Sequence, residues 1–267
     1  MQKLKKLFRP LGIIAAVIGV FALLGFVERT SLGMSIVHLD VKVDGAEGIH
    51  FIDDAAIRAE VLDQGTAIMG AAIGELHIPG IEQRLRNIPC VAKAEVYHTM
   101  NGVLHVRVVQ REPVVRVFDR DGSSFYIDRA GFTMPEQPGR PARVLVVTGN
   151  VHEPGAAESV RSVKADDSLM HRSMLDEIHQ LAVFIRNDPF WSALIDHVVV
   201  TSNGEFELVP RIGAQRILIG DGSSLEQRFQ KLKVFYEKGM ARADWRGYSH
   251  LDLRFADQIV CTKKRTS

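Results

Sequence analysis

Two kinds of hydrophobic pattern divide this chain. An uninterrupted apolar run fills residues 10–27, whereas the rest of the chain mixes short alternating runs with helical ones. As a helix, the run would be roughly 27 Å long, close to the hydrocarbon thickness of a bilayer. The pattern therefore predicts one transmembrane helix at residues 10–27.

The charges beside this run predict its orientation. Four basic residues precede it, Lys3, Lys5, Lys6 and Arg9, and Glu28 and Arg29 cancel after it. The positive-inside rule then makes residues 1–9 a cytoplasmic tail and places the remainder outside the cytoplasm. The alternative is a cleaved signal peptide, which has a shorter apolar region and a small-residue cleavage site. Because only a weak Ser31-Leu32-Gly33 follows, we expect a retained single-pass type II anchor in the cytoplasmic (inner) membrane.

The first block after the anchor, residues 35–113, predicts the order β-α-α-β-β. Hydrophobic residues alternate at Val37, Leu39, Val41 and Val43, as in a half-buried strand. Asp53 is suited to cap a short helix, and residues 75–89 carry apolar positions at helical spacing up to Pro89. Two more strands meet at Asn101-Gly102. The block should form a three-stranded sheet with both helices on one side.

The register of the two strands that meet at Asn101-Gly102 follows from which of their faces is apolar. A three-residue loop ending at Gly102 collects the apolar residues on one face and sets Glu95 opposite Arg107. A two-residue loop would mix polar and apolar groups on both faces. The face expected to be buried consists of Ala92, Ala94, Val96, Leu104, Val106 and Val108.

The second block, residues 114–262, predicts a strand-rich antiparallel domain with two helices. Strands are expected at 114–118, 123–128, 142–149, 193–202, 205–210 and 215–221. Helices are expected at 169–186 and from a capping box at Ser223–Glu226 to Met240. With the first block, the fold class is α+β.

The last strand lies unusually close to the end of the chain. Leu251, Leu253 and Phe255 alternate with Asp252 and Arg254, a period-2 pattern. Such a strand is either enclosed by its own sheet or left as an edge to which a partner strand can be added. At least half of these apolar side chains are expected to face the domain's own core.

Composition and motifs favour neither nucleic-acid binding nor catalysis. Basic and acidic residues nearly balance, 33 against 32, so no electrostatic attraction to nucleic acid is indicated. His98, His105, His171 and His179 do not form a metal-ligand spacing, and no nucleophile motif is present. The glycine-rich Gly220–Ser224 stretch lacks the lysine of a phosphate-binding loop and is explained as a turn into a helix. We expect no enzyme activity, metal or cofactor.

Two cysteines, Cys90 and Cys261, fall in different blocks. An extracytoplasmic location permits disulfides, but a bridge here would require the two blocks to fold onto each other. We therefore interpret both as small, partly buried hydrophobic residues.

Taken in order, several segments resemble the bacterial FtsQ/DivIB family, whose first outer domain is of the polypeptide-transport-associated (POTRA) type. The matching segments are Ile88–Val91 with Ala94 and Val96, Leu104–Val108, Gln110–Val114, Phe125–Gly131 and Leu251–Phe255. The resemblance covers nearly the whole chain. One departure is Gln110-Arg111, where Glu-Arg is commoner.

The resemblance implies a non-enzymatic scaffold of the division machinery at the septum. Its partners would be FtsB- and FtsL-type single-span proteins, with other division proteins reached through the POTRA-like domain and the transmembrane helix. A terminal helix and strand would capture a strand of the FtsB-type partner. The residues expected in that seam are Tyr248, Leu251, Asp252, Leu253, Arg254, Phe255, Gln258 and Val260.

Two alternatives belong to other classes. A POTRA-type domain could bind polypeptides in a secretion or outer-membrane assembly system, but that role favours tandem copies followed by many barrel strands. An anchored hydrolase would require a nucleophile or metal constellation, which the sequence does not offer.

Overall fold

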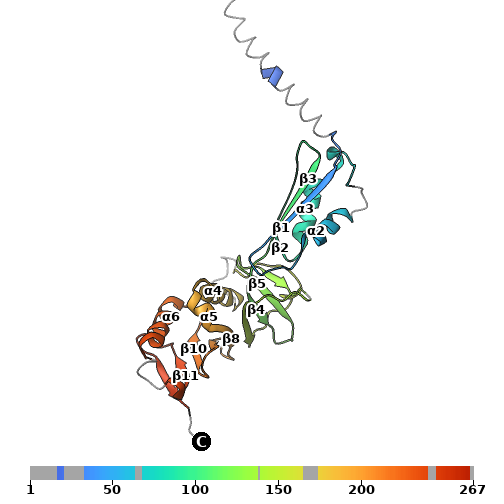
Figure 1. Ribbon diagram of the computed structural model, residues 1–267. Helices are drawn as coiled ribbons and strands as arrows, with labels where there is room; N and C mark the ends of the chain where they lie inside the picture. Colours follow the sequence, from blue (N-terminus) through green and yellow to red (C-terminus); the bar gives the residue numbers. More distant parts are fainter. Residues whose placement is uncertain are drawn as a thin grey trace, which may run out of the picture. The chain divides into compact units, whose positions relative to one another are not determined.

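The computed structural model describes residues 17–20, 33–63, 68–137, 139–164, 174–239 and 245–264. They form two compact units (Figure 1). Unit 1 contains the described residues up to Asp44 together with Ile52–Gln110. Unit 2 contains Gly45–Phe51 and the described residues from Arg111 onward.

Most of the predicted membrane segment lies outside the described residues, as does the tail at residues 1–9. Only residues 17–20 of the apolar run are described, and they are helical. In the described part of the chain, no helix is both long and apolar enough to span a bilayer. The transmembrane helix stays a prediction.

From residue 33 onward, the described part of unit 1 is a three-stranded sheet with two α-helices. Its elements are β1 (His38–Asp44), α2 (Asp54–Leu62), a 3₁₀ turn (Ile73–Glu75), α3 (Ile78–Asn87), β2 (Val91–His98) and β3 (Val103–Gln110). The strand order is β1-β3-β2, with β1 parallel and β2 antiparallel to β3. Asp53 caps α2 as expected, its carboxylate accepting the Ala56 amide at 2.9 Å. The mixed α+β arrangement agrees with the sequence pattern.

The register between β2 and β3 is the predicted one. Glu95 lies opposite Arg107, and Gly102 adopts φ +78° in the three-residue loop. One buried position was wrong: Ala92 is exposed and Val91 is buried instead. An irregularity between Val91 and Lys93 shifts the register there, so the alternation of faces is interrupted at the start of β2.

Unit 2 contains one nine-stranded sheet and three α-helices. Its first strands are β4 (Pro113–Phe118), β5 (Ser124–Asp128), β6 (Thr133–Pro135) and β7 (Leu145–Gly149). Then come α4 (Met174–Asn187), α5 (Pro189–Leu194), β8 (Ile195–Val200), β9 (Phe206–Pro210), β10 (Arg216–Gly220) and α6 (Leu225–Val234). The chain ends with β11 (Tyr248–Asp252) and β12 (Val260–Lys263). The sheet order is β12-β11-β10-β9-β8-β7-β4-β5-β6.

The prediction of an antiparallel sheet was wrong, because this sheet is mixed. The pairs β4–β7, β7–β8 and β10–β11 are parallel. β7 and β8 are joined through α4 and α5, and β10 and β11 are joined through α6. A connection that contains a helix returns the chain to the same end of the sheet, so the next strand runs parallel.

The capping box predicted before α6 does not form. Ser224 occupies the N-cap with φ 52°, and its side chain makes no capping hydrogen bond. Instead, the Asp221 carboxylate accepts the Ser223 hydroxyl at 2.7 Å. After Val234 the helix widens into a π-turn, Phe235–Gly239. The expected end at Met240 lies outside the described residues, as does the first part of the helix expected at 169–186.

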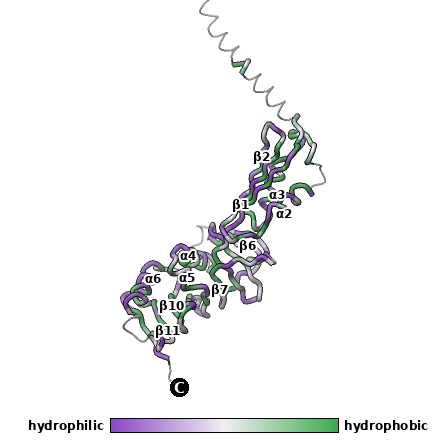
Figure 2. Tube along the Cα trace, in the orientation of Figure 1, coloured by the Kyte–Doolittle hydropathy of each residue, from purple (hydrophilic) through white to green (hydrophobic). Residues whose placement is uncertain are grey.

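Alternating hydrophobic and hydrophilic positions along the strands, visible in Figure 2, give each unit its own core. In unit 2 the buried face of α4 and Phe229 of α6 belong to the same cluster as the central strands. That cluster extends to Leu251 and Leu253 near the C-terminus. Leu251 and the residue just after β11, Leu253, are therefore part of the domain's core.

Candidate partner-binding edge

The strand expected at the end of the chain is an inner strand. β11 pairs in parallel with β10 on one side and antiparallel with β12 on the other. It ends at Asp252, so the expected strand through Phe255 is too long. The chain instead turns at residues 253–259 and returns as β12. Among the described strands, β12 and not β11 has an open outer side.

The apolar residues of the predicted seam divide between core and surface. Leu251 and Leu253 are 1% and 0% exposed, so both belong to the core of unit 2. Phe255 and Val260 are 46% and 39% exposed. The expectation that at least half of the alternating residues face the domain's own core agrees with this placement. Tyr248 is half-buried and packs against the same core.

The backbone of β12 offers hydrogen-bonding groups to a further strand. Amides along an edge strand alternate between the inner neighbour and the outer side. The Lys264 amide donates to the Gly247 carbonyl at 2.7 Å and therefore points inward. The period of two then directs the amides and carbonyls of Cys261 and Lys263 outward.

The polar residues of the predicted seam are engaged within unit 2. Arg254 Nη2 lies 2.6 Å from Asp252 Oδ2, and Arg254 Nη1 lies 3.1 Å from Glu205 Oε2. The hydrogen bond from Arg254 lowers the pKa of Asp252, and the two carboxylates raise the pKa of Arg254. Internal ion pairing occupies the charges from which partner specificity was expected.

An apolar groove lies beside the turn that leads into β12. It has a volume of about 540 Å³ and is lined by the C-terminal part of α6, the π-turn and residues 257–259. Val234, Phe235 and Ile259 supply apolar surface, and Lys231, Lys238 and Asp257 supply charge. Lys231 Nζ also donates to the carbonyls of Leu253 and Phe255, which fixes the turn onto α6.

The sequence did not reveal the groove or β12. Val234 lies outside the stripe of apolar residues that defines the buried face of α6, and its 43% exposure was not anticipated. The available signal was the short run Val260-Cys261-Thr262-Lys263, which is too brief to identify a strand by its period. Gln258, which was expected in the seam, is exposed in the turn before β12.

Two of the segments that resemble the family, Gln110–Val114 and Phe125–Gly131, meet at the other end of the sheet. Arg111 Nη1 forms a largely buried ion pair with Asp128 Oδ2 at 2.7 Å. The neighbouring Glu112 pairs with Arg129 at 3.1 Å. The Asp128 carboxylate also accepts the Phe132 amide at 2.8 Å. These residues join the start of unit 2 to the β5–β6 hairpin, so their contacts explain the motifs structurally.

The residues considered for chemistry are separated or hydrogen-bonded. His105 Nδ1 lies 2.9 Å from an Asp40 oxygen in unit 1, whereas His179 Nε2 lies 3.2 Å from the Arg129 carbonyl in unit 2. His171 lies outside the described residues. In the described ranges, no group of three or more His, Cys, Asp or Glu residues is suited to hold a metal ion. Cys90 is buried in unit 1, and Cys261 is half-buried in unit 2.

Comparison with known proteins gives matches over both units. Residues 112–262 match the family described as FtsQ/DivIB, C-terminal related, and residues 37–109 match the POTRA-like domain. The Cell division protein FtsQ of Rhodothermus marinus is 32% identical over 196 residues, which cover 72% of this chain and 67% of that protein.

Proposed function

Because this chain belongs to the FtsQ/DivIB family, we propose that it is a non-enzymatic scaffold of the bacterial division machinery that captures an FtsB-type partner strand. The family match supports a role in cell division. The partner strand would add to the outer side of β12, and an FtsL-type protein would join through the same complex. A scaffold of this kind uses no cofactor.

The open edge of β12 is the observation that carries this proposal. It offers outward amides and carbonyls at Cys261 and Lys263, and natural proteins usually pair or cover such groups. Added strands gain affinity from main-chain hydrogen bonds and specificity from alternate side chains. A partner of three or four residues in extended conformation would complete this edge.

The residues of the predicted seam support the same proposal, some by contacting the partner and others by holding β11 in place. Phe255, Gln258 and Val260 are exposed and can contact the partner directly. Leu251 and Leu253 act indirectly, by anchoring β11 in the core. Asp252 and Arg254 fix the end of β11 through their ion pair, and Tyr248 packs against the core of unit 2. The groove beside α6 would receive an apolar residue that flanks the partner strand.

The membrane topology is also part of the proposal. The apolar run at residues 10–27 would anchor the chain in the inner membrane, with both units outside the cytoplasm. Alkaline phosphatase fused after residue 264 should be active in cells, whereas green fluorescent protein at the same position should remain dark. The reverse pattern would contradict this topology.

Substitution of Lys263 separates edge pairing from side-chain effects. Lys263→Pro removes an outward amide, and proline is tolerated on an edge strand where its nitrogen faces away from the sheet. Lys263→Ala keeps the amide and removes the charge. The tagged full-length chain is co-expressed with an FtsB-type partner and isolated by affinity capture. We expect capture to be lost in Lys263→Pro and retained in Lys263→Ala.

Folding is monitored in parallel by circular dichroism and thermal unfolding. Equal partner capture by both folded variants would contradict strand addition at β12. If Lys263→Pro unfolds unit 2, Cys261 provides the second site: Cys261→Ser keeps the outward amide, whereas an amide-to-ester replacement at position 261 removes it. Retention of the partner by that ester variant would equally refute the proposal.

A further inference from the structure

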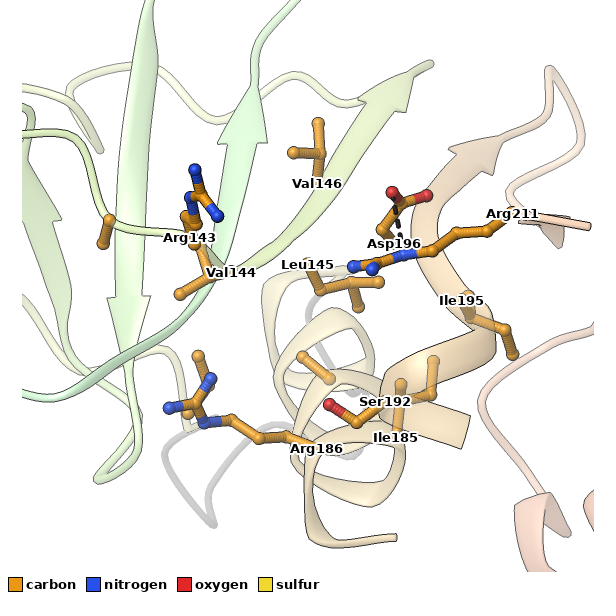
Figure 3. A pocket seen from close by; sticks show the side chains of 13 residues that line it. Arg143, Val144, Leu145, Val146, Ile185, Arg186, Ser192, Ile195, Asp196 and Arg211 are labelled. Atoms are coloured by element: carbon orange, nitrogen blue, oxygen red, sulfur yellow. Dashed lines mark ion pairs between the residues drawn. The ribbon is translucent and has the colours of Figure 1, made fainter. Parts of the chain in front are cut away.

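A second pocket of unit 2 lies away from the β12 edge. It has a volume of about 420 Å³ and lies at the beginning of β7 and β8, next to α4 and α5. Figure 3 shows Arg143 and Arg186 on one side of it and the Asp196–Arg211 ion pair on the other. None of the residues assigned to partner-strand addition lines this pocket.

The pocket has an excess of positive charge. Three arginines line it against one aspartate, which gives a net charge of +2. Arg211 Nε lies 3.1 Å from Asp196 Oδ2, and Arg186 makes only a long contact of 3.5 Å with Glu112. Arg143 is exposed, and among the described residues it has no ion pair. At least one guanidinium is therefore available to an anion.

The floor of the pocket is apolar. Leu145, Ile185 and Ile195 are buried at its base, and Val114 and Ala182 complete the surface. A small inorganic anion could pair with the arginines, but it would leave this apolar surface exposed to water. A ligand that joins a carboxylate to aliphatic groups would satisfy both parts of the pocket.

We propose that this pocket binds an acidic peptide segment of a partner protein, with Asp or Glu carboxylates at Arg143 and at Arg186 and an aliphatic neighbour over Leu145. Arginine is suited to this task because its planar guanidinium makes two parallel hydrogen bonds to a carboxylate. The volume of about 420 Å³ lies within the range of ligand-binding pockets. The inference is independent of strand addition at β12, because the two sites share no residue.

Binding can be measured directly with two matched peptides. Rhodamine-labelled Leu-Glu-Leu-Glu-Leu and Leu-Gln-Leu-Gln-Leu differ only in charge, and fluorescence anisotropy follows their binding to the full-length chain in detergent. We expect the Glu peptide to bind at least ~10-fold more tightly than the Gln peptide, because a charge-assisted Arg–carboxylate pair is lost in the latter.

Three variants connect this binding to the pocket. Arg143→Gln should weaken Glu-peptide binding by ~10-fold, since it removes the charged guanidinium but keeps a polar side chain. Ser192→Phe should abolish binding, because Ser192 is exposed on α5 and a larger side chain there fills the pocket. Arg84→Gln changes an exposed arginine of α3 in unit 1 and should leave binding unchanged.

The proposal is overturned if both peptides bind alike, or if Arg143→Gln and Ser192→Phe leave the affinity unchanged. Equal weakening by Arg84→Gln would show a nonspecific charge effect and would likewise refute it. Inorganic phosphate serves as the third probe. If an equimolar amount of phosphate displaces the Glu peptide, the site binds simple anions and the peptide assignment fails.

Discussion

The nine-stranded sheet of unit 2 ends at β6 on one side and at β12 on the other, and these two outer strands differ in what covers them. At β6 the Thr133 amide donates to the Arg161 carbonyl at 2.8 Å, and the Arg161 amide donates to the Thr133 hydroxyl at 3.0 Å. Pro135 has no amide to offer. At β12 the outward groups of Cys261 and Lys263 have no strand beside them in the described part of the chain.

The comparison shows that the chain itself covers one end of the sheet, whereas the other end is left open, as the proposed strand addition requires. Thr133 is fully buried, whereas Thr262 on β12 is exposed. The open strand is short and carries Lys263, and both features limit indiscriminate pairing with other edges. Changes at the closed end should therefore reduce stability, and changes at the open end should reduce partner capture.

At the closed end, a large loss of stability is expected from Arg111→Ala. The Arg111 and Asp128 side chains are 13% and 3% exposed, and removal of the arginine leaves a buried carboxylate without its cation. Such a change destabilises proteins by ~3–5 kcal/mol. The free energy of unfolding of the full-length chain, from urea titration, measures the effect. The matched Arg216→Ala, which breaks an exposed ion pair with Glu207, should cost under ~1 kcal/mol.

A smaller loss is expected when the covering of β6 is disturbed. Thr133→Val keeps the shape of the side chain but removes the hydroxyl that bonds Ser159 and Arg161. Leaving these buried groups unpaired should cost ~1–3 kcal/mol in the free energy of unfolding. Thr262→Val makes the same chemical change on the open strand and should stay within ~0.5 kcal/mol. Equal costs for the two variants would remove the distinction between the edges.

The acid dependence of stability tests the ion pair at the open end. Because Arg254 lowers the pKa of Asp252, their interaction stabilises the fold fully above the ordinary carboxyl pKa of about 4 and is lost as pH falls through the lowered value. Asp252→Asn should therefore cost up to ~1 kcal/mol near neutral pH, and the difference from wild type should shrink in acid. Urea titrations across this pH range measure it, with Asp257→Asn as the control. A difference independent of pH would exclude the ion pair as its cause.

The smallest effect on stability is expected at Phe255, although its effect on binding should be large. The side chain is 46% exposed, so Phe255→Lys should change the free energy of unfolding by no more than ~0.5 kcal/mol while weakening capture of the FtsB-type partner. Leu253→Lys, two residues away and fully buried, should unfold unit 2. A Phe255→Lys variant that unfolds would assign this residue to the core and remove it from the contact surface.

Sequence periodicity predicted much of the fold because each period reports which face of an element is buried. It identified six of the seven described strands between residues 113 and 221, missing the three-residue β6, together with the register that pairs Glu95 with Arg107 and the helix capped by Asp53. It failed where the chain departs locally from a regular period. The irregular pairing near Val91 and the left-handed Ser224 at the start of α6 are two such places.

The candidate site predicted from the sequence and the open edge of the structure overlap only in part. The sequence directed attention to residues 248–260, of which only Val260 belongs to the outer strand β12. It did not indicate that residues 253–259 form a turn, nor that β12 covers the outer side of β11. The groove beside α6 and the pocket lined by Arg143 and Arg186 are each formed by segments that are distant in sequence. Neither therefore leaves a local pattern in the sequence.

By itself, the sequence determined the order of most of the elements, the faces they bury and the family to which the chain belongs. Only the tertiary structure decided which strand is outermost and which strands run parallel. The physical reason is that side-chain alternation records contacts above and below a sheet, whereas neighbours within the sheet are chosen by backbone hydrogen bonds that every residue except proline can make. The difference between β6 and β12 concerns neighbours within the sheet, so side-chain alternation does not record it.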